Sequence, residues 1–112
     1  MKELDLTKMS AHAIIDRATR FAAIENSVGW GKPLVEATDK KGQDATATLT
    51  DTGVLIVRDF DNMIITAYVA TVRQAQAVWN RATNGAKMPR QLWNVINYNN
   101  NTDYWKRITA AA

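Results

Sequence analysis

The 112-residue chain contains no cysteine, a single histidine and two prolines. Without cysteine it has no disulfide framework, no thiolate nucleophile and no cysteine-based zinc site. Hydrophobic runs are short as well, since none approaches the roughly 18 apolar residues of a membrane-spanning helix. The N-terminal segment MKELDL lacks the apolar stretch of a signal peptide. We therefore expect a cytoplasmic protein with no membrane partner.

Motifs of cofactor and metal chemistry are also missing from the sequence. There is no glycine-rich phosphate loop, no nucleophile elbow, no zinc-protease helix motif and no EF-hand loop. The turn Asp59-Phe60-Asp61-Asn62 holds two carboxylates, but not at the spacing of a calcium loop. We therefore expect neither a cofactor nor a metal ion.

The composition that is present is that of one globular domain over residues 1–112, with 46% hydrophobic and 22% charged residues. The charge is uneven. Residues 1–72 carry 8 basic and 10 acidic side chains, whereas residues 73–112 carry 6 basic and 1 acidic. A basic C-terminal third suits a polyanion such as RNA, because each phosphate contact releases counterions. A basic surface that serves only solubility is the alternative.

An N-terminal amphipathic helix is predicted over Ala11–Glu25, with Ser10 as its cap and apolar residues at helical spacing. His12, Asp16 and Arg20 form one polar stripe opposite the apolar side, and Arg17 lies further round. The helix dipole disfavours an imidazolium at this end, so we expect a neutral His12 able to accept a proton. Arginines can grip a phosphate through two hydrogen bonds. A polar surface without chemistry is the alternative.

Period-two alternation then predicts three strands separated by tight turns, hence an antiparallel meander. The strands are Asp44–Thr50, Val54–Arg58 and Met63–Val69. Residues 34–41 are predicted as a short helix that ends at Gly42.

A helical period returns after the strands, in a helix from about residue 72 to residue 83 that Asn84-Gly85 ends. The residues expected on its apolar face are Val72, Ala75, Trp79 and Ala82. Pro89 suits the first turn of a second helix. Its predicted apolar face is Leu92, Trp93 and Ile96, its predicted end is Asn99-Asn100-Asn101, and Thr102 can cap a last helix. The fold class is therefore α+β: an N-terminal amphipathic helix packed on a small antiparallel meander, followed by C-terminal helices.

The last predicted strand places two hydroxyls on one side. The apolar set Met63, Ile65, Ala67 and Val69 is expected to face the core, since alternate side chains share a side. That leaves Thr66 and Tyr68 on an open side, where their hydroxyls can meet a phosphate or a leaving oxygen. Arg58 precedes the turn at residues 59–62, and its side chain can face either side of the sheet because this loop does not fix the hairpin register. Thr and Tyr are also simply good strand formers, which is the alternative.

Aromatic and basic residues alternate in the C-terminal third. The aromatic residues are Trp79, Trp93, Tyr98, Tyr104 and Trp105, and the basic residues among and beside them include Arg73, Arg90, Lys106 and Arg107. Aromatic rings can stack on bases while cations meet phosphates. Alternatively, Trp79 and Trp93 lie on apolar helix faces and fill the core.

Two segments of the chain resemble a known family. Residues 10–21 (SAHAIIDRATRF) and the strand IITAY at residues 64–68 are similar to phage-borne and toxin-like members of the barnase–EndoU–colicin–RelE superfamily. The resemblance lies in residue type and order over residues 10–21 and about 53–70. Members cleave RNA without a metal, by attack of the 2′-hydroxyl on the adjacent phosphate. Residues 84–112 add helical material that compact members lack.

The resemblance implies His12 as general base or acid, Arg17 and Arg20 as phosphate ligands, and Thr66 and Tyr68 as substrate contacts. The residues expected to bind more of the substrate are Arg58, Arg73, Lys106 and Arg107. An RNA substrate and a cognate antitoxin or immunity protein are the expected partners.

Two other functions fit the sequence. One is a non-catalytic phage-type accessory or inhibitor protein that binds a host protein, because exposed aromatic residues are common at such surfaces. The other is a nucleic-acid binder that uses the basic C-terminal segment.

Overall fold

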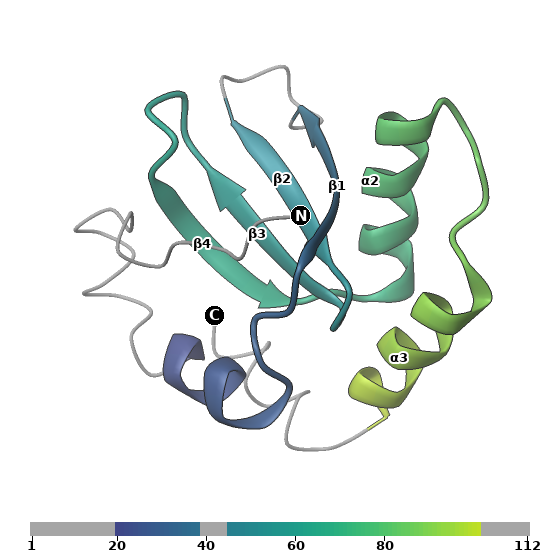
Figure 1. The fold of residues 1–112 in the computed structure, drawn as a ribbon, viewed down its shortest axis with the longest axis horizontal. Coiled ribbons are helices and arrows are strands. Elements are labelled where there is room, and N and C mark those ends of the chain that lie inside the picture. The colour runs from purple at the N-terminus through teal and green to yellow at the C-terminus, as the bar shows by residue number, and fades with distance from the viewer. Residues whose placement is uncertain (1–19, 39–44, 102–112) are drawn as a thin grey trace.

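The computed structural model describes residues 20–38 and 45–101, so predictions for residues 1–19, 39–44 and 102–112 lie outside it. A helical segment over residues 20–27 comes first. It is followed by β1 (Pro33–Thr38), β2 (Thr46–Thr50), β3 (Val54–Arg58), β4 (Ile64–Val69), α2 (Val72–Thr83) and α3 (Arg90–Asn100). The strands form one antiparallel sheet in the order β1-β2-β3-β4, as Figure 1 shows. The α+β class is confirmed.

The strand β1 corrects the sequence prediction, because residues 34–41 are predicted from the sequence to form a short helix. Leucine, glutamate and alanine in this segment are good helix formers, which explains the expectation. In the structure β1 pairs with β2 from Pro33 opposite Thr50 to Thr38 opposite Thr46. Pairing with a neighbouring strand therefore overrides the local preference, and the meander has four strands instead of three.

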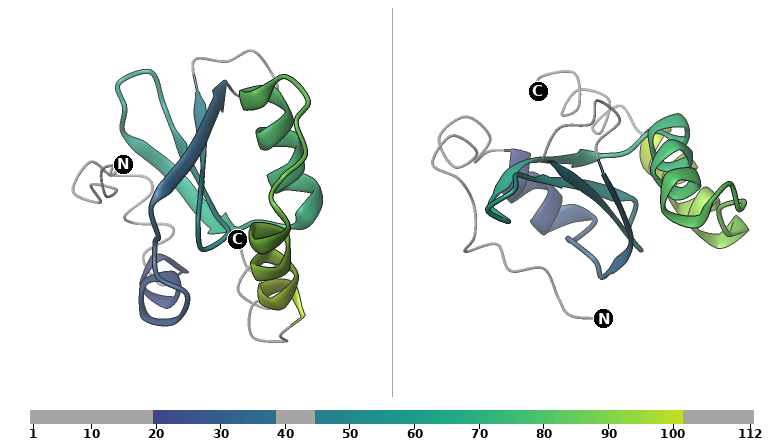
Figure 2. Two further views of the ribbon diagram at one scale, coloured as in Figure 1. Left: turned by 45° about the vertical axis from the view of Figure 1, so that its right-hand side comes forward. Right: turned by 90° about the horizontal axis from the view of Figure 1, so that it is seen from above.

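Helices cover both faces of the sheet, which Figure 2 shows from two directions. We call the face that carries the N-terminal helical segment the first face. There Phe21 and Ile24 pack on apolar residues of β3 and β4. On the second face, residues of α2 and α3 such as Val78 and Ile96 pack on apolar residues of β1, β2 and β3. Most of the predicted N-terminal helix, residues 11–19, lies outside the described residues.

The prediction of one open side on β4 is wrong. Ile64 and Ala70 were expected on the open side and are buried, whereas Met63 and Ile65 of the expected core set are only half-buried. One reason is a β-bulge: Arg58 pairs with Ile64 and Val57 pairs with Thr66, so the residue between has no partner and the alternation shifts. The other reason is that both faces carry a helical layer.

The helix α2 has the predicted bounds, and local hydrogen bonds explain them. The Thr71 side chain accepts a bond from the Gln74 backbone, and the Gln74 side chain accepts one from the Thr71 backbone. This capping box satisfies N–H groups that the first turn leaves without partners. At the other end Asn84 is left-handed, with φ 60°. Asn84-Gly85 therefore ends the helix as predicted.

Two predicted helix faces need correction. On α2 the buried residues are Ala75 and Val78, while Ala82 is exposed. On α3 the side chain of Trp93 is 45% exposed instead of lying in the core. The helix α3 also continues through Asn100, so the asparagine tract belongs partly to its last turn. The packed face thus gains Val78 and loses Ala82 on α2, and gains Asn99 and loses Trp93 on α3.

The β2–β3 turn is the point where both helical layers are fastened to the sheet. The Thr52 hydroxyl donates to the Gly29 carbonyl (2.9 Å), and the Asn99 amide donates to the Thr52 carbonyl (2.9 Å). The Asp51 carboxylate accepts a bond from the Lys32 backbone N–H (2.9 Å). Gly31 lies so close to this turn that a Cβ there would be 2.5 Å from Asp51 Oδ1. The loop before β1 and the end of α3 therefore meet at one turn.

Gly29 and Gly31 give a matched test of this close packing, because their φ values are +75° and +74°. An added Cβ meets nothing within 4 Å at Gly29 but collides with Asp51 and Thr52 at Gly31. Both alanine substitutions carry the strain of a left-handed residue, about 1–2 kcal/mol. Gly31→Ala is expected to lose about 1–3 kcal/mol more in the free energy of unfolding, through overpacking. Urea denaturation of the two variants measures the difference, and equal losses would contradict the close packing.

Candidate functional site

The structure brings together two of the predicted site residues, Arg20 and Thr66. Arg20 Nη2 donates to Thr66 Oγ1 at 3.1 Å, across 46 positions of sequence. Arg20 is buried at the start of the described helical segment, and Thr66 lies on the edge strand β4 directly after the bulge. A guanidinium group is therefore held against a hydroxyl at the edge of the sheet.

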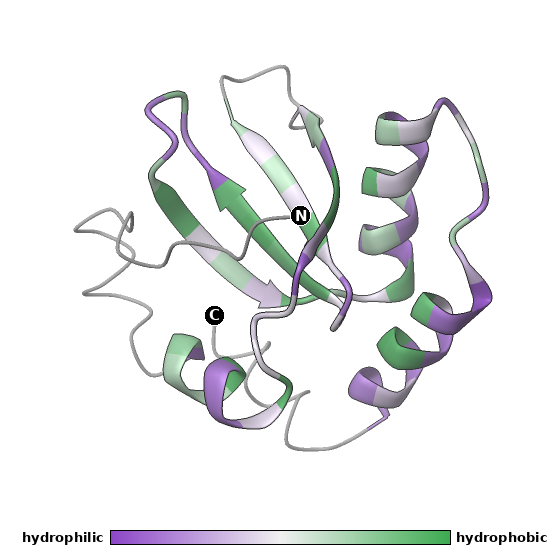
Figure 3. Cartoon of the chain, viewed as in Figure 1, coloured by the Kyte–Doolittle hydropathy of each residue, from purple (hydrophilic) through white to green (hydrophobic). Residues whose placement is uncertain are grey.

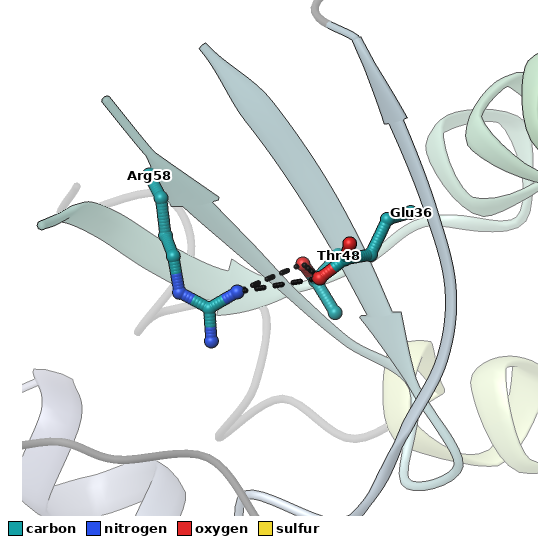
Figure 4. A network of polar contacts seen from close by, with 3 residues as sticks. All are labelled: Glu36, Thr48 and Arg58. Carbon is teal, nitrogen blue, oxygen red and sulfur yellow. Dashed lines mark hydrogen bonds and ion pairs between the residues drawn. The ribbon is translucent and has the colours of Figure 1, made fainter. Parts of the chain in front are cut away.

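A second polar cluster lies on the first face and joins β1, β2 and β3. Figure 4 shows Arg58 of β3 reaching across β2 toward β1. Arg58 Nη1 donates to Thr48 Oγ1 (3.3 Å), Thr48 Oγ1 donates to Glu36 Oε1 (3.2 Å), and Arg58 Nη1 lies 3.5 Å from Glu36 Oε1. One guanidinium, one hydroxyl and one carboxylate from three strands thus form a closed network.

The strand register explains why these three side chains meet. Thr48 is opposite Glu36 on one side and opposite Ile56 on the other. Directly opposed residues share a face, and Arg58 follows Ile56 by two positions, so it points the same way. Because Ile56 belongs to the apolar cluster under the N-terminal helical segment, the network lies on the first face.

The electrostatics of the network are asymmetric. The Arg58 side chain is 14% exposed, whereas that of Glu36 is 57% exposed. Thr48 is fully buried. Among the described residues no further hydrogen bond is made by Glu36 Oε2 or by the Nε and Nη2 atoms of Arg58. A carboxylate oxygen and guanidinium N–H groups thus remain for a ligand beside a rigid hydroxyl.

Two members of this network, Glu36 and Thr48, were missed by sequence reasoning. Glu36 lies in the segment that was predicted as a helix, so it could not be assigned to a strand face. Thr48 was assigned to the alternating strand before the first turn but was given no role. The usable signal was the pattern of threonines at positions 46, 48 and 50, which marks a polar side of β2.

Two other predicted site residues, Tyr68 and Arg73, lie away from the two clusters, on the side of the second face. Tyr68 pairs with Leu55 and packs against the apolar cluster on the second face, beneath the C-terminal helices. Arg73 is exposed in the first turn of α2, which belongs to the layer on that second face. His12, Arg17, Lys106 and Arg107 lie outside the described residues.

No group of three His, Cys, Asp or Glu side chains that could hold a metal ion occurs within residues 20–38 and 45–101. In those same ranges no helix has the length and apolar character needed to cross a membrane. Comparisons with models of known families, with curated proteins and with solved structures found no match to this chain. The residues and their geometry are therefore the whole basis for a function.

Replacing Glu36 by glutamine is expected to leave the fold nearly as stable, since an ion pair with an exposed partner contributes less than about 1 kcal/mol. Thr48→Val is expected to cost about 1–3 kcal/mol, because it removes the acceptor of a largely buried guanidinium. Urea denaturation measures both. A Glu36→Gln loss as large as that of Thr48→Val would show that the carboxylate serves the fold.

Proposed function

We propose that this chain is a small cytoplasmic endoribonuclease that cleaves single-stranded RNA without a metal ion. The single observation that carries the proposal is the closed network of Glu36, Thr48 and Arg58 on the first face. It combines a proton acceptor with a cation beside it, which are two groups that cleavage of a phosphodiester by its own 2′-hydroxyl requires. The resemblance of residues 10–21 and 64–68 to the barnase–EndoU–colicin–RelE superfamily favours the same reaction.

In the proposed reaction the Glu36 carboxylate accepts the proton of the ribose 2′-hydroxyl. The 2′ oxygen forms a bond to phosphorus while the bond from phosphorus to the 5′ oxygen breaks. The electron pair of that bond stays on the 5′ oxygen, which takes a proton from a water molecule, and the protonated Glu36 carboxyl afterwards returns its proton to the solvent. The products are a 2′,3′-cyclic phosphate and a free 5′-hydroxyl.

The cations act on the charge that develops at phosphorus. Arg58 offers N–H donors from a side chain whose orientation is set by Thr48. Arg20 is held at Thr66, on the strand next to that of Arg58. Guanidinium groups that are fixed before the reaction stabilise a phosphorane-like transition state without reorganisation. Thr48 and Thr66 are thus proposed as positioning residues for the two arginines.

The expected result is that purified protein cleaves single-stranded RNA equally well with and without a chelator and leaves 2′,3′-cyclic phosphate ends. Glu36→Gln is expected to lower kcat about 10²-fold or more, the usual contribution of a general base. Gel electrophoresis with end-group analysis measures both results.

Glu25→Gln is the matched control, because Glu25 is an exposed carboxylate that makes no hydrogen bond among the described residues. It is expected to cleave like the unchanged protein. Absence of cleavage under all conditions, or equal activity of the Glu36 and Glu25 variants, would refute the proposal.

A second candidate, a binding module for a host protein, is favoured by Phe60. This ring is 77% exposed at the tip of the β3–β4 turn. The turn is rigid, because Asp59 Oδ1 accepts hydrogen bonds from the backbone N–H groups of Asp61 and Met63. A ring held out on a rigid tip can insert into an apolar pocket of a partner.

If the binding module is correct, Phe60→Ser abolishes capture of one stoichiometric host protein while RNA cleavage is absent in both forms. Affinity capture followed by mass spectrometry tests this, with Glu25→Gln as the control. Capture that does not change in Phe60→Ser would remove the candidate.

A further inference from the structure

The helical layer on the second face carries positive charge without any acidic residue. Residues 62–102 contain no Asp or Glu. Within them Arg73, Arg81, Lys87 and Arg90 are all exposed. Figure 3 shows the apolar strand β3 in the centre of the molecule and hydrophilic positions on the helices beside it. An exposed surface of one charge sign attracts a partner of the opposite sign.

Three of these cations follow one another along the chain where α2 passes into α3. Arg81 is in the last turn of α2, Lys87 is in the connection, and Arg90 is the first residue of α3. Within the part of the chain that the structure describes, neither Lys87 nor Arg90 forms an ion pair. Their charge is therefore not neutralised by those residues.

The position of Arg81 links this layer to the candidate site. Arg81 Nε donates to the carbonyl of Thr38 at 3.1 Å, which fixes the end of α2 beside the end of β1. Figure 1 shows the same juxtaposition of the two ends. Glu36 precedes Thr38 by two residues, about 7 Å along the strand. A path from Glu36 to the cationic helices therefore leads around the end of β1.

An aromatic side chain lies close to one of these cations, Arg90. Trp93 is 45% exposed and follows Arg90 by three positions in α3, so the two side chains are neighbours on the helix surface. An exposed ring beside a guanidinium is the combination that binds single-stranded nucleic acid, because the ring stacks on a base and the cation meets the phosphate.

We infer that the RNA strand extends beyond the cleaved phosphodiester, around the end of β1, onto a flanking site made by Arg81, Lys87, Arg90 and Trp93. This inference rests on the proposed function, because it takes RNA as the substrate. It names the substrate class more closely: a single strand several nucleotides longer than the dinucleotide at the reacting phosphate. The flanking site binds through charge and stacking, so it has little base preference.

Binding is tested with the full chain carrying Glu36→Gln, so that cleavage is slow during the measurement, and with a fluorescent single strand of about 15 nucleotides. Adding Lys87→Gln and Arg90→Gln is expected to weaken binding at least tenfold and to lower the slope of log affinity against log salt by one to two units. Adding Trp93→Leu instead is expected to weaken binding about tenfold at unchanged salt slope. Lys32→Gln, which removes an exposed charge elsewhere, is the matched control.

Cleavage separates the flanking site from the reacting site. With the native Glu36, the Lys87/Arg90 double variant is expected to cleave a dinucleotide normally and to show a raised KM only for the long strand. If all variants cleave and bind the long strand alike, the flanking site is refuted while the proposed function stands. If nothing is cleaved but the double variant still loses RNA affinity, the proposed function alone fails.

A different partner would also be visible in the binding experiment. Binding of polyglutamate as tight as that of RNA, with no effect of Trp93→Leu, would indicate an acidic protein surface as the ligand. That outcome would overturn the flanking site as an RNA site.

Discussion

Two hydrogen bonds to Thr52 connect the three layers of this protein. The Thr52 hydroxyl donates a hydrogen bond to the Gly29 carbonyl in the loop before β1. The Thr52 carbonyl accepts a hydrogen bond from the Asn99 side-chain amide at the end of α3. The adjoining Gly53 has φ +82°, and a Cβ there would lie 3.0 Å from Ile96 Cγ1. Because both helical layers converge on this turn, the sheet, the first helical segment and α3 have one common reference point.

That arrangement leaves little of the sheet for chemistry. Both faces of β3 and β4 are occupied by apolar clusters, so a polar side chain there must find partners or lie at an edge. The two polar clusters obey this rule. Arg20 donates a hydrogen bond to Thr66 on the edge strand β4. Arg58 donates to Thr48 on β2 and pairs with Glu36 on β1, in the polar part of the first face. The helical layers on the two faces of the sheet thus determine where a ligand can approach the described residues.

Predictions from the sequence were confirmed where signals within a few residues set the bounds of a helix or strand. They were wrong where contacts between residues distant in sequence set the structure. The helix over residues 72–83 and the strand Val54–Arg58 have their predicted bounds, because a capping box, a left-handed stop and tight turns lie beside them in sequence. The strand β1 was missed, since its helix-favouring composition is overruled only by pairing with β2. Of the candidate site, Arg20, Arg58 and Thr66 were named from the sequence. Glu36 was not named, because the segment that carries it was predicted as a helix.

The sequence by itself determined the α+β class, the bounds of the helix and hairpin strands that begin and end at local signals, and the uneven charge. These follow from periodicity, turn residues and composition, which act over a few residues. Only the tertiary structure decided which side chains share a face. The second helical layer covers Tyr68, the register of β1, β2 and β3 brings Glu36 beside Arg58, and the packing of α3 leaves Trp93 at the surface. Such pairings depend on strand register and layer packing, which no short window of residues encodes.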